Sequence, residues 1–204
     1  AAYTVYPDCT PKMLAWYFRW MNVHSEGMPN GHNLRYKIWN PVDHIDHGFV
    51  NGRDKTDGIY QKEALDMGKG EEAFYSIRHP FDLRDYGLTK EREKGLNDAG
   101  CFVDCAVEKF YTTDPSHELL PGTHLTLTLS RFCPYGGMEK RTSEWIGYGV
   151  ADGEIYFDES TPPIMLTVDY MKKVLYHNIV ESQQLNKILP GLYAEYSDKS
   201  DDED

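Results

Sequence analysis

A strictly alternating segment in the second half of the chain constrains the fold more than any other feature. Residues 124–132 read HLTLTLSRF, so leucine alternates with threonine or serine. Successive side chains of a β-strand point to opposite faces. This period of two therefore predicts a strand with Leu125, Leu127 and Leu129 on one face. Such a strand is typical of an antiparallel sheet whose two faces differ.

Further strands and a short helix are predicted around this segment. Residues 11–21 (PKMLAWYFRWM) predict an amphipathic helix, because Thr10 is a suitable N-cap and Pro11 is favoured at the first helical position. The polar, glycine-rich segment 48–70 is predicted to be a long loop. Strands are expected at residues 34–39, 73–78, 101–112, 144–150 and 154–157, with a turn at 134–137.

The C-terminal part of the chain predicts one long helix. It is expected to follow Thr161 and two prolines, to cover residues 164–188 and to stop before Pro190. Antiparallel strands followed by such a helix indicate an α+β fold, in which a curved antiparallel sheet grips the C-terminal helix and leaves a cavity. Residues 1–196 are expected to form this single domain. The acidic residues 197–204 (SDKSDDED) are expected to form a disordered tail, since they cannot bury apolar area.

Composition argues against several classes of function. The 204 residues carry a formal net charge of -12, whereas nucleic-acid binding needs a basic surface for phosphate contacts. No segment is long and apolar enough to cross a bilayer, and the first ten residues do not read as a secretory signal. The four cysteines show no familiar zinc spacing, so we expect free thiols and a cytoplasmic protein.

Two polar residues on the long helix are candidates for a metal site. His177 and Glu181 are four residues apart, which places both side chains on one helical face. An imidazole and a carboxylate so placed can chelate one divalent ion, and a carboxylate that faces a cavity needs a metal, a lysine or an arginine as partner. A solvent-exposed pair that supports the helix is the alternative. The rest of the helical stripe is apolar or aromatic: Tyr170, Val174, Leu185 and Ile188.

A second polar cluster, DHIDH at residues 43–47, directly follows the predicted strand break at Asn40 and Pro41. Loops that follow strands commonly bind ligands. Two histidines and two aspartates within five residues can supply a metal ligand together with a nearby acid or base. A solvated polar turn is the alternative interpretation of this cluster.

Two sequence motifs resemble one enzyme family. Residues 35–44 (RYKIWNPVDH) resemble the R-Y-K-L-W-H-P-x-D-H signature of the diacetylphloroglucinol hydrolase and phloretin hydrolase family. His177 and Glu181 resemble the family's H-x-x-x-E pair, and residues 189–196 resemble the L-P-x-L-Y-A-x-Y that follows it. Arg131 and the phenylalanine after it resemble the S-R-F end of the family's long strand. Both strong motifs occur in the family's order.

The resemblance implies a helix-grip (START-like) fold and a zinc ion bound by two histidines and two glutamates. Carried over to this sequence, three ligands are His44, His177 and Glu181. The fourth is a glutamate on a strand, at a register near Tyr75, for which Glu72 is the first choice and Glu71 the next. The resemblance also implies a small aromatic, polyketide-like substrate and a homodimer.

The activity implied by the resemblance is hydrolysis of the carbon–carbon bond between a phenolic ring and an acyl group. Protonation of a ring carbon removes the aromaticity, and zinc polarises the acyl carbonyl. Tyr36 would hold a phenolic oxygen, Tyr135 would be a further catalytic tyrosine, and His47 would move protons. The residues expected to contact the substrate are Tyr36, Trp39, Arg131, Tyr156 and Tyr170.

Two other functions are compatible with the same cavity. A metal-free cyclase or isomerase of secondary metabolism, similar to a pericyclase, would act through shape and hydrogen bonds. A small-ligand carrier would bind without turnover. Departures from the family signature favour these alternatives, namely Asn40 in place of histidine, His47 in place of asparagine, and the absence of an evident strand glutamate. The metal content of the protein separates the hydrolase from both.

Overall fold

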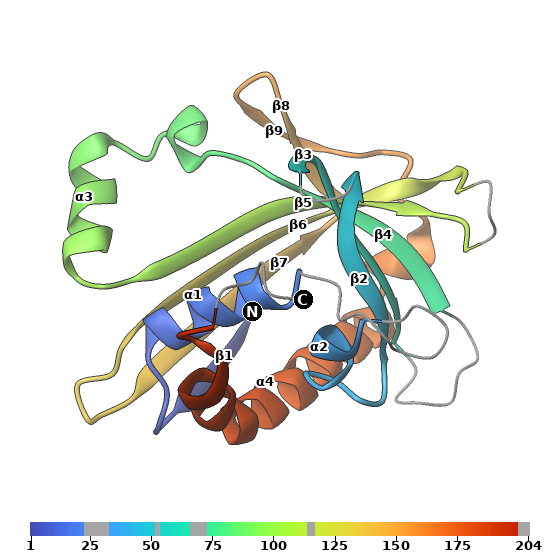
Figure 1. Cartoon of the computed structure of the whole chain (residues 1–204). Coiled ribbons are helices and arrows are strands. Elements are labelled where there is room, and N and C mark those ends of the chain that lie inside the picture. The colour runs from blue at the N-terminus through green and yellow to red at the C-terminus, as the bar shows by residue number, and fades with distance from the viewer. Residues whose placement is uncertain (23–32, 52–53, 66–72, 114–116, 200–204) are drawn as a thin grey trace.

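The computed structural model describes residues 1–22, 33–51, 54–65, 73–113 and 117–199. Within this part of the chain, seven antiparallel strands form a curved sheet in the order β1-β7-β6-β5-β4-β3-β2 (Figure 1). A separate two-stranded sheet pairs β8 (Tyr148–Ala151) with β9 (Glu154–Phe157). The strands of the large sheet are β1 (Ala2–Tyr6), β2 (His44–Asn51), β3 (Asp54–Ala64), β4 (Ala73–Pro80), β5 (Phe102–Tyr111), β6 (Leu119–Phe132) and β7 (Met138–Ile146).

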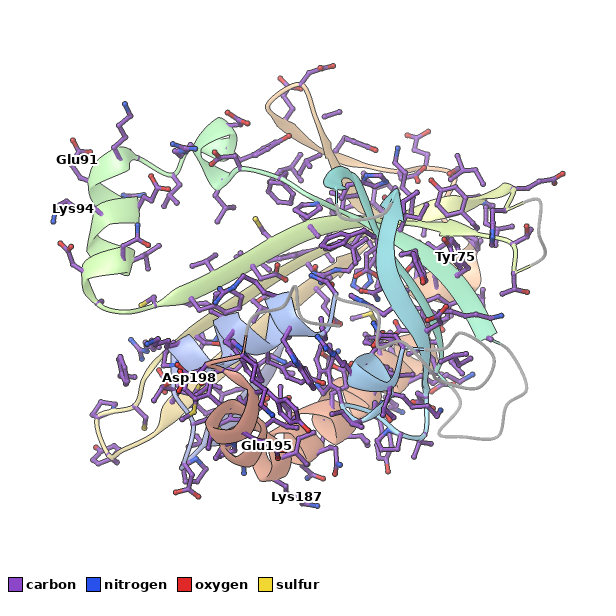
Figure 2. The ribbon with its side chains drawn as sticks, viewed as in Figure 1. Tyr75, Glu91, Lys94, Lys187, Glu195 and Asp198 are labelled. Atoms are coloured by element: carbon purple, nitrogen blue, oxygen red, sulfur yellow. The ribbon has the colours of Figure 1, made fainter. Side chains whose placement is uncertain are left out.

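The helices α1 (Pro11–Trp20), α2 (Leu34–Lys37) and α4 (Val168–Tyr196) lie on one side of the sheet (Figure 1). The α+β helix-grip fold expected from the sequence is therefore confirmed. Helix α3 (Lys90–Asp98) and the 3-10 turn η2 (Leu83–Tyr86) lie away from α4, and Glu91 and Lys94 of α3 project outward (Figure 2).

The apolar core joins α1 to the C-terminal half of α4. Trp16 stacks on Trp20 with ring centroids 5.3 Å apart and meets Tyr193 edge-on at 5.4 Å. Leu185 and Leu189 of α4 are fully buried in the same cluster. Aromatic and aliphatic burial of this kind is the main favourable contribution to folding, so this cluster fixes α4 against α1.

The alternating segment forms most of β6, as the sequence predicts. Its polar face, with Thr126, Thr128 and Ser130, is buried on the side of α4, while Leu127 and Leu129 on the other face are only half-buried. The side of the sheet that α4 covers is therefore lined by hydroxyl groups along this strand. The strands expected at 73–78, 101–112 and 154–157 and the turn at 134–137 are confirmed.

Residues 34–39 were predicted to be a strand, and this prediction was wrong because residues 34–37 form the short helix α2. The side-chain oxygen of Asn33 accepts a hydrogen bond from the backbone N–H of Tyr36 at 3.1 Å and so caps the helix. A local cap of this type satisfies backbone donors that a strand would have to pair with a neighbour.

The predicted loop at 48–70 was also wrong, since much of it forms β2 and β3, with residues 52–53 and 66–70 outside the described part of the chain. Gly58 in β3 has a φ of 102°, and a Cβ there would lie 2.5 Å from the Ile77 side chain. This glycine allows close approach to β4, so it supports the strand pairing instead of interrupting it.

Helix α4 starts later and ends later than predicted. Residues Pro163–Leu166 form the 3-10 turn η3, and Thr167 is the N-cap of α4. Pro190 lies inside the helix and leaves the carbonyl of Asn186 without its usual N–H partner. The thiol of Cys9 contacts that carbonyl oxygen at 4.0 Å, which offsets part of the loss. The helix ends at Tyr196, while residues 200–204 of the predicted tail lie outside the described residues.

Truncation of the buried helix face should destabilise the protein. We expect Leu185→Ala to lower the free energy of unfolding by about 3 kcal/mol, because a fully buried leucine leaves a cavity when shortened. Lys187→Ala is the control, since Lys187 is exposed on the same helix (Figure 2). Chemical denaturation checks both variants, and equal losses would contradict the assigned inward face.

Candidate metal centre and cavity

Two imidazoles and two carboxylates meet beneath the sheet. They belong to His44, Glu63, His177 and Glu181, and all four residues are buried. One nitrogen or oxygen atom from each lies within 4.8 Å of the others, so these residues could hold a metal ion. His44, His177 and Glu181 are the ligands expected from the sequence, whereas Glu63 was not anticipated.

Secondary structure explains how these four residues converge. His44 begins β2 and is directly opposite Glu63 of β3 in the antiparallel register. Directly opposite residues in such a pair place their side chains close together on one face. His177 and Glu181 are one turn apart on the inward face of α4. A strand pair and a helix thus each supply one histidine and one glutamate.

The distances fit a small tetrahedral cation. His44 Nε2 lies 2.6 Å from Glu181 Oε1 and 3.4 Å from Glu63 Oε2. His177 Nε2 lies 3.1 Å from Glu181 Oε1 and 3.6 Å from Glu63 Oε2. Ligands at about 2.0–2.2 Å from a tetrahedral zinc ion are separated by roughly 3.3–3.6 Å. The two distances to Glu63, 3.4 and 3.6 Å, fall within this range. The two distances to Glu181, 2.6 and 3.1 Å, are shorter and would have to open to admit such an ion.

Outer hydrogen bonds turn the same nitrogen of each histidine toward the centre. His44 Nδ1 lies 3.0 Å from the backbone oxygen of Tyr36, and His177 Nδ1 lies 3.0 Å from Asp43 Oδ2. A proton on each Nδ1 leaves Nε2 free to bind a cation, which is the usual arrangement of histidine ligands. Asn40 holds Asp43 in place, because its side-chain oxygen accepts the Asp43 backbone N–H at 3.2 Å.

The electrostatics favour a positive charge within the cluster. Burial opposes ionisation of Glu181, yet His177 and His44 lower the pKa of this carboxyl below its usual range. The pKa of Glu63 is also lowered, because the two histidines outweigh its burial. Burial alone would lower the pKa of His177, but Glu181, Asp43 and Glu63 raise it well above its usual value. Two ionised carboxylates therefore draw a proton or a metal cation to this point.

A cavity opens from the cluster along the polar face of the sheet, and it contains a second ionisable group. His124 of β6 lies between Glu108 of β5 and Glu144 of β7. Its Nδ1 is 3.7 Å from Glu108 Oε2 and its Nε2 is 4.0 Å from Glu144 Oε2. Burial lowers the pKa of His124, but the two carboxylates outweigh it and the net pKa is raised. Both contacts exceed hydrogen-bond length, so the interaction with each carboxylate is electrostatic.

Three of the residues expected to meet a substrate line this cavity, namely Tyr36, Trp39 and Tyr170. The Tyr36 hydroxyl donates a hydrogen bond to Glu63 Oε2 at 2.5 Å. Its pKa is raised well above its usual value by burial and by nearby carboxylates, chiefly Glu63. Tyr36 is therefore a neutral phenol whose single proton is directed to a candidate metal ligand.

His47 is buried but is absent from the cavity lining. Its ring packs against the Tyr36 ring with centroids 4.4 Å apart. The sequence predicted a site role for His47 because it is only three residues from His44. His44 and Glu63 of the facing strand reach the cluster, while His47 is opposite Gln61 further along the pair. His124, which the sequence analysis did not single out, does line the cavity.

Three other expected site residues lie away from the cavity. Tyr135 is 97% exposed in the turn between β6 and β7. Arg131, near the same turn, is exposed and pairs with Glu139. Tyr156 belongs to the two-stranded sheet and its ring packs near Gly149. Arg131 and Tyr135 lie away from the cavity because the long strand β6 carries its end beyond it, and Tyr156 lies away because it belongs to the separate sheet of β8 and β9.

The expected fourth ligand, Glu72, and its neighbour Glu71 lie outside the described residues. The described position nearest the expected register is Tyr75 (labelled in Figure 2), which stacks on Tyr60 with centroids 5.8 Å apart. Phe74 lines the cavity, so Tyr75 points to the opposite face of β4. Among the described residues, Glu63 supplies the second carboxylate and fourth donor of the cluster, from the segment that was predicted to be a loop.

Comparisons with known proteins found a matching family model and a similar enzyme. A family model described as "DAPG hydrolase PhiG domain" matches residues 1–194. The chain belongs to the DAPG hydrolase family. Phloretin hydrolase from Eubacterium ramulus is 30% identical over 207 aligned residues, which cover 96% of this chain and 67% of that enzyme. The family resemblance expected from the two terminal motifs is thus confirmed.

In this DAPG hydrolase family member, the two sequence motifs supply most of the residues that the fold brings together at the cluster. The N-terminal motif supplies His44 together with Tyr36 and Asp43, which orient the two histidines. The C-terminal motif supplies His177 and Glu181 on one helix. Among the described residues, no helix combines the length and apolar character that a membrane span requires. All four cysteines are free thiols, as expected.

Exchanging one carboxylate for an amide should separate the two candidates for the fourth ligand. We expect Glu63→Gln to lower metal affinity by about 10- to 100-fold or more, because an amide loses the negative charge that binds a cation. Glu72→Gln is the comparison variant and should retain the wild-type affinity. Competition with a chromophoric chelator measures both, and the reverse pattern would reject Glu63 as a ligand.

Proposed function

We propose that this chain is a zinc-dependent hydrolase of the carbon–carbon bond that joins an acyl group to a phenolic ring. The observation that carries the proposal is the convergence of His44, Glu63, His177 and Glu181 within 4.8 Å. Membership of the DAPG hydrolase family supports hydrolysis, and the relative named phloretin hydrolase supports a phenolic ketone as substrate.

Zinc suits this donor set better than a larger or harder cation. Two imidazole nitrogens and two carboxylate oxygens at tetrahedral spacing are ligands that zinc accepts, while magnesium and calcium prefer more oxygen atoms. When bound, zinc supplies the positive charge that polarises the acyl carbonyl. Burial of His44 and Glu181 beneath the sheet excludes bulk water, which strengthens that effect.

Tyr36 contacts both the candidate metal ligands and the substrate. Its hydroxyl proton is donated to Glu63, so the oxygen can only accept a hydrogen bond from a ligand. A phenolic hydroxyl of the substrate is a suitable donor. Because Tyr36 also stacks on His44 with centroids 3.7 Å apart, its ring fixes the position of one histidine while its oxygen orients the phenol.

The reaction needs a proton at the ring carbon that carries the acyl group. An acyl phenol resists cleavage while aromatic, and protonation of that carbon converts the ring to a β-dicarbonyl form. Attack by water on the acyl carbonyl then breaks the bond to the ring carbon. The electron pair of that bond restores the aromatic phenol, and the acyl group leaves as a carboxylic acid that carries the oxygen of the water. His124 is the cavity residue suited to donate the proton, because Glu108 and Glu144 favour its protonated form.

The metal-free cyclase or isomerase and the simple carrier remain competing predictions for the same cavity. Both were favoured by the lack of an evident fourth ligand. Glu63 completes a set of four buried donors, which a shape-based cyclase or a carrier does not require. The complete set therefore favours the hydrolase.

Removing one ligand should abolish both metal binding and hydrolysis. We expect Glu181→Gln to reduce zinc content to background and phloretin hydrolysis by at least about 100-fold, because the metal supplies several kcal/mol of charge stabilisation. Glu195→Gln, at an exposed position near the end of the same helix (Figure 2), is the control. Elemental analysis and product assays test this, and a metal-free, fully active Glu181→Gln protein would reject the proposal.

The acid role of His124 predicts a pH dependence. Its pKa is raised above 6.5, so the protonated form persists to higher pH and is lost as the pH rises through the raised value. We expect kcat to fall on that alkaline side. His124→Gln should lower kcat by about 100-fold or more and remove this limb. His79→Gln, outside the cavity lining, is the control. An unchanged pH profile in His124→Gln would exclude the role.

A further inference from the structure

Arg78 and Lys140 are the two cationic side chains of arginine or lysine that line the described cavity, and they differ in their pairing. Arg78 is neutralised within the protein. Its guanidinium lies 2.9 Å from Asp104 and 3.1 Å from Glu108, and it also donates to the Thr126 hydroxyl at 3.2 Å. Arg78 therefore lines the cavity wall as an ion-paired residue, and its positive charge is already compensated by these carboxylates.

Lys140 of β7 has no such partner. The residue is only 3% exposed, yet its ammonium makes no hydrogen bond or ion pair with the residues that the structure describes. Among the described residues, the ammonium contacts the face of the Trp39 ring, whose centroid is 5.8 Å from Nζ. A cation–π contact of this length is weak, and lysine is rarely buried without an anionic partner because desolvation is costly.

Two neighbouring donors also have no acceptor among the described residues. Ser130 is directly opposite Lys140 in the β6–β7 register, and its buried hydroxyl is unpaired. The indole N–H of Trp39 is likewise buried without a partner. Lys140 and Trp39 line the cavity, whereas the fully buried Ser130 does not. An ammonium and an indole N–H on the same wall call for an oxygen acceptor, preferably an anionic one.

Lys140 lies across the cavity from part of the metal centre. His44 and Glu63 come from β2 and β3, whereas Lys140 comes from β7, which is separated from β3 by three strands. Trp39 contacts both regions. Its ring lies edge-on to the His44 ring with centroids 5.1 Å apart, and the Lys140 ammonium lies over the face of the same Trp39 ring. A substrate whose acyl group lies at the centre can therefore extend its ring along Trp39 toward Lys140.

We propose that Lys140 is a specificity residue that binds an ionised phenolic oxygen on the substrate ring, opposite the acyl group that is cleaved. This inference rests on the proposed function for the orientation of the substrate. It assigns the preference for a free hydroxyl at that ring position to one ammonium group. It also explains why this cation is buried beside Trp39 without a carboxylate.

Ligand affinity tests this subsite without turnover. The probes are two analogues of phloretin in which a methylene group replaces the carbonyl, one with a free hydroxyl opposite the side chain and one methylated there. In the zinc-loaded wild type we expect the free form to bind about 10- to 100-fold more tightly, as charged hydrogen bonds imply. In Lys140→Met the preference should disappear, while Lys140→Arg should retain part of it.

Lys187→Met is the matched control, since Lys187 is an exposed lysine on α4 (Figure 2) and should keep the wild-type preference. Calorimetric titration gives the affinities, and phloretin hydrolysis is assayed in parallel. An unchanged preference in Lys140→Met, or no preference in the wild type, overturns the proposal. A preserved preference in a wild type that does not hydrolyse phloretin supports the subsite and rejects only the proposed hydrolysis.

Discussion

The burial of two carboxylates at one point governs the organisation of this structure. Glu63 and Glu181 repel each other and lose hydration, so their ionised forms persist only beside a compensating positive charge. The surrounding residues meet this need: two imidazoles approach them, Asp43 orients one ring, and Tyr36 donates its proton to a carboxylate. The strand pair, the helix and the motif segments are arranged so that these groups meet.

Stability and chemistry occupy different halves of α4. The C-terminal half, with Leu185 and Leu189, packs into the aromatic core with α1, whereas the preceding turns face the polar cavity. A cavity lined by threonines and charged groups contributes little apolar burial. The rigid aromatic cluster therefore holds the helix in place while the adjoining turns carry groups that do not favour folding by themselves.

Sequence patterns predicted those features that depend on local periodicity. The alternation at residues 124–132 located β6, and the spacing of His177 and Glu181 located half of the candidate metal centre. Glu63 was missed because it reaches the centre through cross-strand pairing with His44, within a segment whose glycines suggested a loop. Residues 59–64 (IYQKEA) show no alternation of apolar and polar residues that would have marked this segment as a strand. Motif resemblance drew attention to Arg131, but only the length of β6 shows that it lies beyond the cavity.

The four donor residues also come from widely separated parts of the polypeptide. His44 and Glu181 are 137 positions apart, and the four cysteines form no disulfide. A cation held by all four would close a very large covalent loop, much as a cross-link between distant cysteines restricts the unfolded ensemble. Resistance to unfolding would then vary with free metal concentration. The same four side chains would thus act both as a reaction centre and as a reversible cross-link between distant parts of the chain.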